Sequence, residues 1–387
     1  MLLHEDQDFA LRREGRFLCA TFGRPHRVLS TCPVNGGLRE DLTHVCNHQS
    51  CEGSGHADRH ALINDLGLQA YHHRACREAG IPGATTALMS TAANMQCAVL
   101  ATASREELEV RVAATAGVLG NATRAGDRAP WHETRQGNRR VESESRVETR
   151  IETAAEIGGT IVAMVFINRP CTRACLVRAA TMVTEGKSVA ILDLRMPSRQ
   201  SAGLATGTGT DQIAIAAPLA GDGEWERHWA GSHGTLGELL ARATRDAVSR
   251  CLLLQNGVCA ELRRSIWGAL GRHGCTEEAL RRCARVELSR EEAELFEHNL
   301  MALVHDPQSA AAAYCLAESV DLSAAGVLHP EVAREAVLNQ AGLLAATVAV
   351  HPERFAYFRD ALKAEVERCP GELAALAVVR GFSAKWS

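Results

Sequence analysis

Histidine and cysteine side chains are concentrated in one short stretch, THVCNHQSCEGSGHADRH, from Thr43 to His60. Both side chains bind transition metals, and a neutral imidazole also exchanges protons near neutral pH. The spacing fits no standard zinc template, because four residues separate Cys46 from Cys51 and no second cysteine pair lies nearby. His56 and His60 are four residues apart and would share one face of a helix. Three interpretations stay open: a divalent-metal site built from Cys46, Cys51, His56 and His60, a catalytic segment, or a surface crossing.

Three glycine-rich stretches follow predicted strands and could bring backbone amides close to a ligand. The first, CPVNGGLRED, places Arg39 and Asp41 beside the turn residues Asn35, Gly36 and Gly37. The second, AGVLGNATRAGD, carries Arg124 and Asp127. Two such stretches at strand ends suggest a shared cleft, although each could also be an ordinary strand-ending turn.

The third stretch, GLATGTGTD, alternates threonine with glycine and ends at Asp211. No Gly-Lys-Ser/Thr sequence follows, and the next predicted element is a strand, so the stretch is neither a P-loop nor a dinucleotide fingerprint. Its exposed amides could hold an oxyanion, and a threonine hydroxyl could act as a nucleophile if a base lies near. A purely structural glycine turn is the competing interpretation.

Composition excludes several classes of protein. The net charge of −4 and the scarcity of aromatic residues argue against nucleic-acid binding, which needs a basic face or stacking platforms. No apolar stretch approaches the roughly 18 residues that a membrane span needs. The N-terminus lacks an apolar signal region, and the 14 cysteines form no repeated framework. We expect a cytoplasmic protein with reduced thiols.

The pattern along the chain predicts an α/β (α+β) domain over residues 1–255 and an all-helical domain over 256–387. Short β-branched runs and amphipathic segments alternate up to Asn256, after which Ala-, Leu-, Glu- and Arg-rich stretches replace all strand signals. The C-terminal helices would pack on the first domain or form a homo-oligomer interface. Predicted strands are 16–23, 26–34, 86–91, 96–103, 108–118, 160–168, 188–194 and 211–218, the first two forming a hairpin; predicted helices before Asn256 are 57–79, 171–185 and 235–254.

Six stretches, in order and spacing, resemble the adenosylcobinamide amidohydrolase (CbiZ-type) family. They are VLSTCPVNGGLREDLTHVCNHQ, ATAGVLGNATRAGD, GGTIVAMVFIN, TMVTEGKSVAILDL, GLATGTGTDQIAIA and AGSHGTLGELLARA. The resemblance implies hydrolysis of the amide that joins the aminopropanol arm of a corrinoid to its ring, in cobamide salvage and remodelling. The strand in GGTIVAMVFIN also resembles the aminopeptidase and ornithine-acetyltransferase type of fold, in which helices enclose two sheets. A mixed β-sheet core with flanking helices, arranged as an αββα sandwich, is therefore expected.

The resemblance also implies a set of functional residues. We expect Asn47 and His48 of the Asn-His-Gln pattern, with Thr208 and Asp211, to be catalytic. The substrate-binding candidates are Asn35, Gly36, Gly37, Arg39, Asp41, Arg124, Asp127, Glu185, Lys187, Gly207, Gly209, Thr210 and His233.

The simplest mechanism makes His48 the general base that activates water or the Thr208 hydroxyl. Asp211 would orient His48 or protonate the leaving amine, and amides of the threonine-glycine stretch would stabilise the oxyanion. The corrinoid is then a substrate rather than a cofactor. The alternatives are a corrinoid- or metal-binding protein without hydrolysis, and an amidase for another imported metal chelate such as a siderophore.

Overall fold

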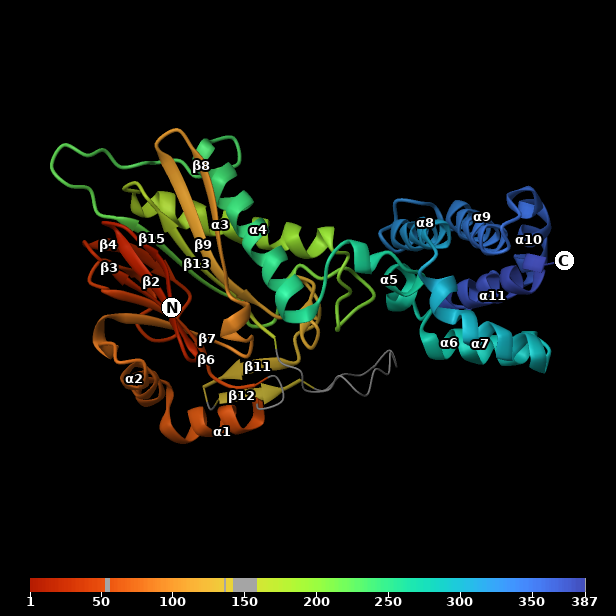
Figure 1. Cartoon of the computed structure of the whole chain (residues 1–387), viewed down its shortest axis with the longest axis horizontal. Helices are drawn as coiled ribbons and strands as arrows, with labels where there is room; N and C mark the ends of the chain where they lie inside the picture. The colour runs from red at the N-terminus through yellow and green to blue at the C-terminus, as the bar shows by residue number, and fades with distance from the viewer. Residues whose placement is uncertain (53–55, 136, 142–158, 387) are drawn as a thin grey trace. The chain divides into compact units, whose positions relative to one another are not determined.

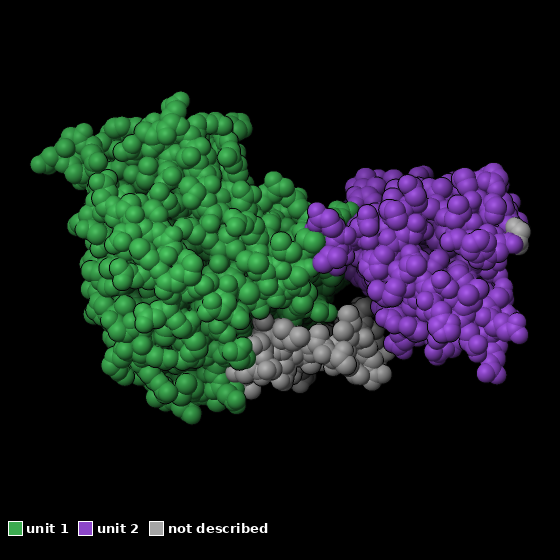
Figure 2. Space-filling view, in the orientation of Figure 1, with its two compact units in different colours: residues 1–144, 150–259 green, residues 145–149, 260–387 purple. Residues whose placement is uncertain are grey.

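The computed structural model describes residues 1–52, 56–135, 137–141 and 159–386. Among these, the chain divides into two compact units, one ending at Cys259 and one beginning at Ala260, coloured separately in Figure 2. No helix in the described part of the chain is long and apolar enough to cross a membrane.

The first unit contains two mixed sheets (Figure 1). In the five-stranded sheet A only β6 and β7 are parallel, and in the six-stranded sheet B only β13 and β15 are parallel. Sheet A has the order β1 (Leu2–Glu5), β2 (Phe9–Glu14), β3 (Phe17–Phe22), β6 (His44–Gln49), β7 (Thr86–Thr91). Sheet B has the order β5 (Gly37–Arg39), β4 (His26–Ser30), β15 (Gln212–Pro218), β13 (Ile161–Ile167), β9 (Leu108–Ala116), β8 (Val99–Arg105).

The two sheets pack face to face, with apolar side chains of both in one core. Leu18 and Val45 of sheet A share this core with Met164 and Ala216 of sheet B. Successive residues of a strand point to opposite faces, so each sheet also has an outer face. Helices cover both outer faces, which confirms the expected αββα sandwich.

The outer face of sheet A lies under α2 (Leu68–Glu78), where Ala75 and Cys76 pack against Phe17 and Leu88. The preceding helix, α1 (His56–Leu66), ends next to Gly67, whose φ of +77° breaks the single helix predicted over 57–79. Glycine adopts this left-handed conformation without the penalty that other residues carry.

The outer face of sheet B lies under α3 (Arg173–Asp193) and α4 (Thr235–Asn256). The two helices approach closely at Gly186, where an added Cβ would lie 2.6 Å from the Ala241 carbonyl oxygen. The strand predicted over 188–194 is wrong, because this segment is almost entirely the last turns of α3. Its buried residues Ala190 and Ile191 continue the helical spacing of Val183 and Gly186.

Two further sequence predictions need correction. Residues 16–23 and 26–34 do not form a hairpin, because β3 pairs within sheet A and β4 within sheet B. Arg24 and Pro25 therefore carry the chain from one sheet to the other. The segment His44–Gln49 was not predicted as a strand, yet β6 lies inside sheet A between β3 and β7.

The charged segment 133–156 lies largely outside the described residues. Its first part belongs to a two-stranded hairpin of β11 (Trp131–Thr134) and β12 (Gly137–Arg140). Another short pair, β10 (Ala122–Thr123) and β14 (Gly207–Thr208), joins two of the glycine-rich stretches.

The second unit is helical throughout its described part and has its own apolar core, which includes Phe296, Leu316, Leu344 and Phe358. Ser289 forms a capping box with Glu292 at the start of α7 (Arg290–Val304). The helices are α5 (Ile266–Leu270), α6 (Glu277–Glu287), α7 (Arg290–Val304), α8 (Pro307–Ala324), α9 (Pro330–Val348), α10 (Phe355–Leu362) and α11 (Pro370–Ser383).

Candidate active site

Thr208 and Asp211 face each other across the short bend between β14 and β15. The Thr208 hydroxyl donates a hydrogen bond of 2.6 Å to Asp211 Oδ1, and the Thr208 backbone N–H donates one of 3.1 Å to Oδ2. The Ile161 backbone N–H also donates to Oδ1, at 3.2 Å. A hydroxyl bonded to a carboxylate is polarised toward loss of its proton. The bend therefore combines a potential nucleophile with a potential base.

Lys187 of α3 completes this group. Its Nζ lies 2.5 Å from Asp211 Oδ2, and the two side chains are only 12% and 14% exposed. Gly207 leaves the space that the pair occupies, because an added Cβ would lie 2.4 Å from both Lys187 Nζ and Asp211 Oδ2. The packing of α3 on sheet B thus places a cation beside the carboxylate. We call Thr208, Asp211 and Lys187 the threonine centre.

The second glycine-rich stretch lies directly against the third. Ala122 pairs with Thr208, and Thr123 pairs with Gly207. The Ala125 backbone N–H donates to the Thr206 hydroxyl at 2.8 Å. The structure therefore brings together two stretches that are about 80 residues apart in sequence, as their similar composition suggested.

Asp127 and Arg124 hold the turn of the second stretch. Asp127 Oδ2 accepts hydrogen bonds from the Arg124 backbone N–H at 3.0 Å and from the Ser198 hydroxyl at 2.5 Å. Burial raises the pKa of Asp127, but hydrogen bonds from Ser198, Ser201 and the Arg124 backbone outweigh it, so the pKa lies below its usual value. The Arg124 guanidinium donates to the Leu204 carbonyl oxygen.

Two further hydroxyls adjoin the threonine centre. Thr160, just before β13, and Thr210 lie with their Oγ1 atoms 2.7 Å apart. The Thr210 backbone N–H points toward Thr208 Oγ1 at 3.4 Å. Sequence reasoning missed Thr160, whose position beside Thr210 depends on the parallel pairing of β13 with β15.

Asn47 and His48 point in opposite directions from β6. Asn47 Nδ2 donates a 2.9 Å hydrogen bond to the Thr115 hydroxyl of β9, so Asn47 faces sheet B. His48 faces the outer layer and stacks on Phe17, with ring centroids 4.4 Å apart. This side chain is 3% exposed, and neither ring nitrogen has a hydrogen-bond partner among the described residues.

The surroundings of His48 keep its ring neutral. Burial is the main cause that lowers the pKa of His48 to about 4; the positive charge of Arg16 acts in the same direction, and Glu78 opposes the shift. A neutral imidazole could serve as a base only for a group within hydrogen-bond reach.

Asp211 lies on the other outer side of the sandwich. Ile213 and Ile215, two and four residues on, pack into the core under α3 and α4, and the bond from Lys187 of α3 places Asp211 on that same face. Both sheets therefore separate Asp211 from His48. The predicted pairing of these two residues is not present in the structure, because strand alternation sends their side chains to opposite layers.

The first glycine-rich stretch is tied to β7 rather than to the threonine centre. Asn35, with a φ of +56°, donates through Nδ2 to the carbonyl oxygens of Gly83 and Thr86 at 2.8 and 2.9 Å. Arg39 forms a two-pronged ion pair with Asp41, at 2.7 and 2.6 Å. Gly36 is required sterically, because an added Cβ would collide with the Cys32 carbonyl oxygen.

Glu185 and His233 are also outside the threonine centre. Glu185 is exposed on α3, two residues before Lys187. His233 is exposed just before α4, whose far end bonds to the second glycine-rich stretch through Asn256 Oδ1 and the Val118 backbone N–H. At 1.5 Å per residue this helix spans roughly 30 Å, so its start lies well away from that stretch.

The predicted metal candidates do not assemble into a site among the described residues. Cys46 forms a disulfide with Cys19, its partner across β3 and β6, so it offers no thiolate and the expectation of uniformly reduced thiols fails at this pair. Cys51 is a free, half-buried thiol. The side chains of His56 and His60 lie outside the described part of the structure. No group of three or more His, Cys, Asp or Glu side chains in the described ranges could hold a metal ion.

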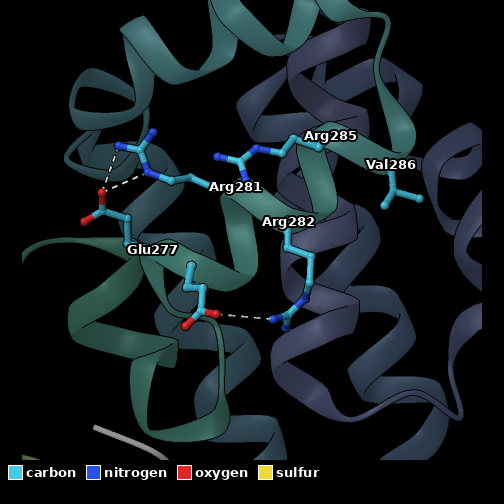
Figure 3. Close-up of a pocket in the computed structure, with 6 residues that line it drawn as sticks. Glu277, Arg281, Arg282, Arg285 and Val286 are labelled. Atoms are coloured by element: carbon cyan, nitrogen blue, oxygen red, sulfur yellow. Dashed lines mark hydrogen bonds and ion pairs between the residues drawn. The ribbon is translucent and has the colours of Figure 1, made fainter. Parts of the chain in front are cut away.

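The C-terminal unit has a surface hollow of its own, of about 550 Å³, along α6 (Figure 3). Three arginines line it, but each is paired with a glutamate. Arg281 lies 2.8 Å from Glu277, Arg282 lies 3.9 Å from Glu278, and Arg285 lies 3.1 Å from Glu297. The hollow therefore carries no excess positive charge that would indicate an anion site.

Comparisons with known proteins find a match that spans the first unit. A family model described as adenosylcobinamide amidohydrolase matches residues 2–260. The chain is also similar to an uncharacterized protein, MJ1613, of Methanocaldococcus jannaschii, with 30% identity over 189 residues, which cover 49% of this chain and 71% of that protein.

Proposed function

Since the chain belongs to the adenosylcobinamide amidohydrolase family, we propose that it hydrolyses the amide between the aminopropanol arm and the corrin ring of adenosylcobinamide or a closely related corrinoid. Such a reaction serves cobamide salvage and remodelling. The observation that supports it best is the hydrogen bond of 2.6 Å from the Thr208 hydroxyl to Asp211, with Lys187 on the other carboxylate oxygen.

In this proposal Thr208 is the nucleophile and Asp211 the base. Thr208 Oγ1 attacks the amide carbonyl carbon while its proton passes to Asp211. The tetrahedral intermediate then collapses, the C–N bond breaks and the leaving amine takes a proton. Water hydrolyses the resulting ester, which releases the corrin carboxylate and restores the Thr208 hydroxyl.

The remaining groups have supporting roles. Lys187 orients the Asp211 carboxylate through their 2.5 Å contact. The Thr210 backbone N–H, 3.4 Å from Thr208 Oγ1, is the donor we propose for the developing oxyanion. One such donor is typically worth about 3 kcal/mol of transition-state stabilisation. No metal enters these steps.

The decisive experiment incubates the purified full chain with adenosylcobinamide and with a panel of complete cobamides. Mass spectrometry of the corrin product should show loss of the aminopropanol arm and gain of a carboxylate. Parallel reactions with a chelator, and elemental analysis of the protein, test the need for a divalent metal. Stoichiometric corrinoid binding without cleavage would refute the hydrolase and favour a corrinoid-binding protein. If the protein cleaves a siderophore amide and not the corrinoid, it is an amidase whose substrate is another metal chelate.

A further inference from the structure

The side-chain amide of Asn121 has one end that is bonded and one buried end, Oδ1, without a hydrogen-bond donor in the described ranges. Its Nδ2 donates to the Gly159 carbonyl oxygen, which fixes which end of the amide is nitrogen. The other end, Oδ1, is buried and has no hydrogen-bond partner among the described residues. A buried acceptor without a donor typically costs about 1–3 kcal/mol, so such an atom in a native site calls for a partner.

Asn121 and its partner Gly159 are each one residue along the chain from a residue that adjoins the threonine centre. Asn121 directly precedes Ala122, which pairs with Thr208. Its partner Gly159 directly precedes Thr160, whose hydroxyl contacts Thr210. The position beside Asn121 accepts no side chain, because a Cβ on Gly159 would lie 3.1 Å from Asn121 Oδ1 and 2.2 Å from the Gly117 carbonyl oxygen.

The chemistry of the scissile bond supplies the missing donor. A secondary amide presents a carbonyl oxygen, which needs donors, and an N–H group, which needs an acceptor. The Thr210 backbone N–H and the threonine hydroxyls are donors. Asn121 Oδ1 is a buried acceptor without a hydrogen-bond partner in the described part of the structure, and its chain neighbour Ala122 pairs with Thr208.

We propose that Asn121 Oδ1 accepts the N–H of the scissile amide, which makes Asn121 a substrate-contact residue that selects secondary amides. This inference rests on the proposed amidohydrolase function. A site built to bond an N–H group rejects analogues that lack it, because its own polar atom is then left unpaired.

The test compares the corrinoid amide with the matching ester, in which oxygen replaces the N–H of the aminopropanol arm. In Asn121→Ala we expect kcat/KM for the amide to fall about 10- to 100-fold, as loss of one buried hydrogen bond predicts. For the ester, kcat/KM should change by less than about twofold. The matched control is Asn168→Ala, which removes another hydrogen-bonded asparagine, bonded to Glu107 and Glu109 at the other end of β13. It should leave the amide-to-ester ratio unchanged.

Equal losses on amide and ester would overturn the inference and give Asn121 a structural role, and unchanged kinetics on both would also overturn it. If Asn121→Ala does not fold, the same two substrates are compared in Asn121→Asp. It retains an acceptor oxygen, so it should keep the wild-type ratio of kcat/KM for the amide to that for the ester, and a fall in that ratio would count against the inference. A wild-type protein that cleaves neither compound refutes the proposed function itself, and the inference with it.

Discussion

Asp211 and His48 point toward opposite outer layers of the αββα sandwich, with both sheets between their side chains. Asp211 meets Lys187 of α3, whereas His48 stacks on Phe17 under the layer that holds α2. The two residues therefore lie in separate environments. Of these two environments, the one at Asp211 combines a hydroxyl, a carboxylate and a cation within hydrogen-bond distance.

Thr208 should be essential for turnover. Thr208→Ala removes the proposed nucleophile and should lower kcat at least about 1,000-fold, whereas Thr208→Ser keeps a hydroxyl and should retain activity within about tenfold. Asp211→Asn should lower kcat about 100- to 10,000-fold through loss of the base. Corrin product formation measures the effect, and circular dichroism checks the fold. A fully active Thr208→Ala with inactive Asp211→Asn would mean that Asp211 activates water directly.

Gly207 and Gly209 form a matched pair for testing the ion pair. Gly207→Ala would place a methyl group 2.4 Å from both Lys187 Nζ and Asp211 Oδ2, whereas Cβ on Gly209 meets nothing within 4 Å. Both contacted atoms end side chains that can shift, so the cost is that of inserting a methyl group into a packed site, typically about 1–3 kcal/mol. We expect Gly207→Ala to lower the free energy of unfolding by about that amount, and Gly209→Ala to change it by less than about 1 kcal/mol. Denaturant titration measures both, and equal destabilisation would contradict the steric argument.

His48 should make the fold sensitive to acid. Because burial lowers its pKa to about 4 from 6.5, the unfolded chain binds a proton between pH 6.5 and 4 that the folded protein does not. The contribution of the neutral His48 to the free energy of unfolding is therefore fully present above pH 6.5. It is lost as the pH falls toward 4, and the loss amounts to about 3 kcal/mol.

The variant that tests this is His48→Phe, which keeps an aromatic ring on Phe17 but cannot titrate. Its free energy of unfolding, measured at pH 7 and pH 4, should fall less than that of the wild type. The buried residues His26 and His72 are present in both proteins, so the difference isolates His48. An identical fall in both proteins would place the acid sensitivity elsewhere.

The bond between Cys19 and Cys46 should be recovered chemically. Peptide mapping without reductant should give one cross-linked fragment that holds both residues, which are 27 positions apart. For a closed loop of this length the chain-entropy model gives about 3–4 kcal/mol of stabilisation. Cys19→Ser with Cys46→Ser should lose about that much, whereas Cys51→Ser, which alters a free thiol, serves as the control. Free alkylation of both cysteines in the native protein would contradict the bond.

Residues after Cys259 should be dispensable for catalysis. The second unit has its own apolar core, and the family model ends at residue 260. We expect residues 1–259 to fold and to retain turnover, and the full chain alone to form an oligomer through its helices. Light scattering and activity assays of both proteins test this. If residues 1–259 fold but have no activity, the residues after Cys259 take part in the reaction.

Local sequence predicted much of the framework of this protein. The spacing of apolar residues located α4 and the start of α3. The sequence pattern also predicted the strands β9, β13 and β15, whose residues form long alternating or apolar runs. It failed at β6, because histidine, cysteine and asparagine in alternation resemble a ligand cluster more than a buried strand.

By itself the sequence determined which residues carry chemistry, since threonine, glycine and aspartate at Gly207–Asp211 are visible without coordinates. Only the tertiary structure decided which of them meet. Lys187 reaches Asp211 because α3 packs across sheet B, and Ala122 lies opposite Thr208 because β10 pairs with β14. His48 and Asn47 are neighbours in sequence yet face different layers, because side chains alternate along a strand and a sheet has two faces. Contacts between distant segments depend on packing and register, which no local pattern encodes.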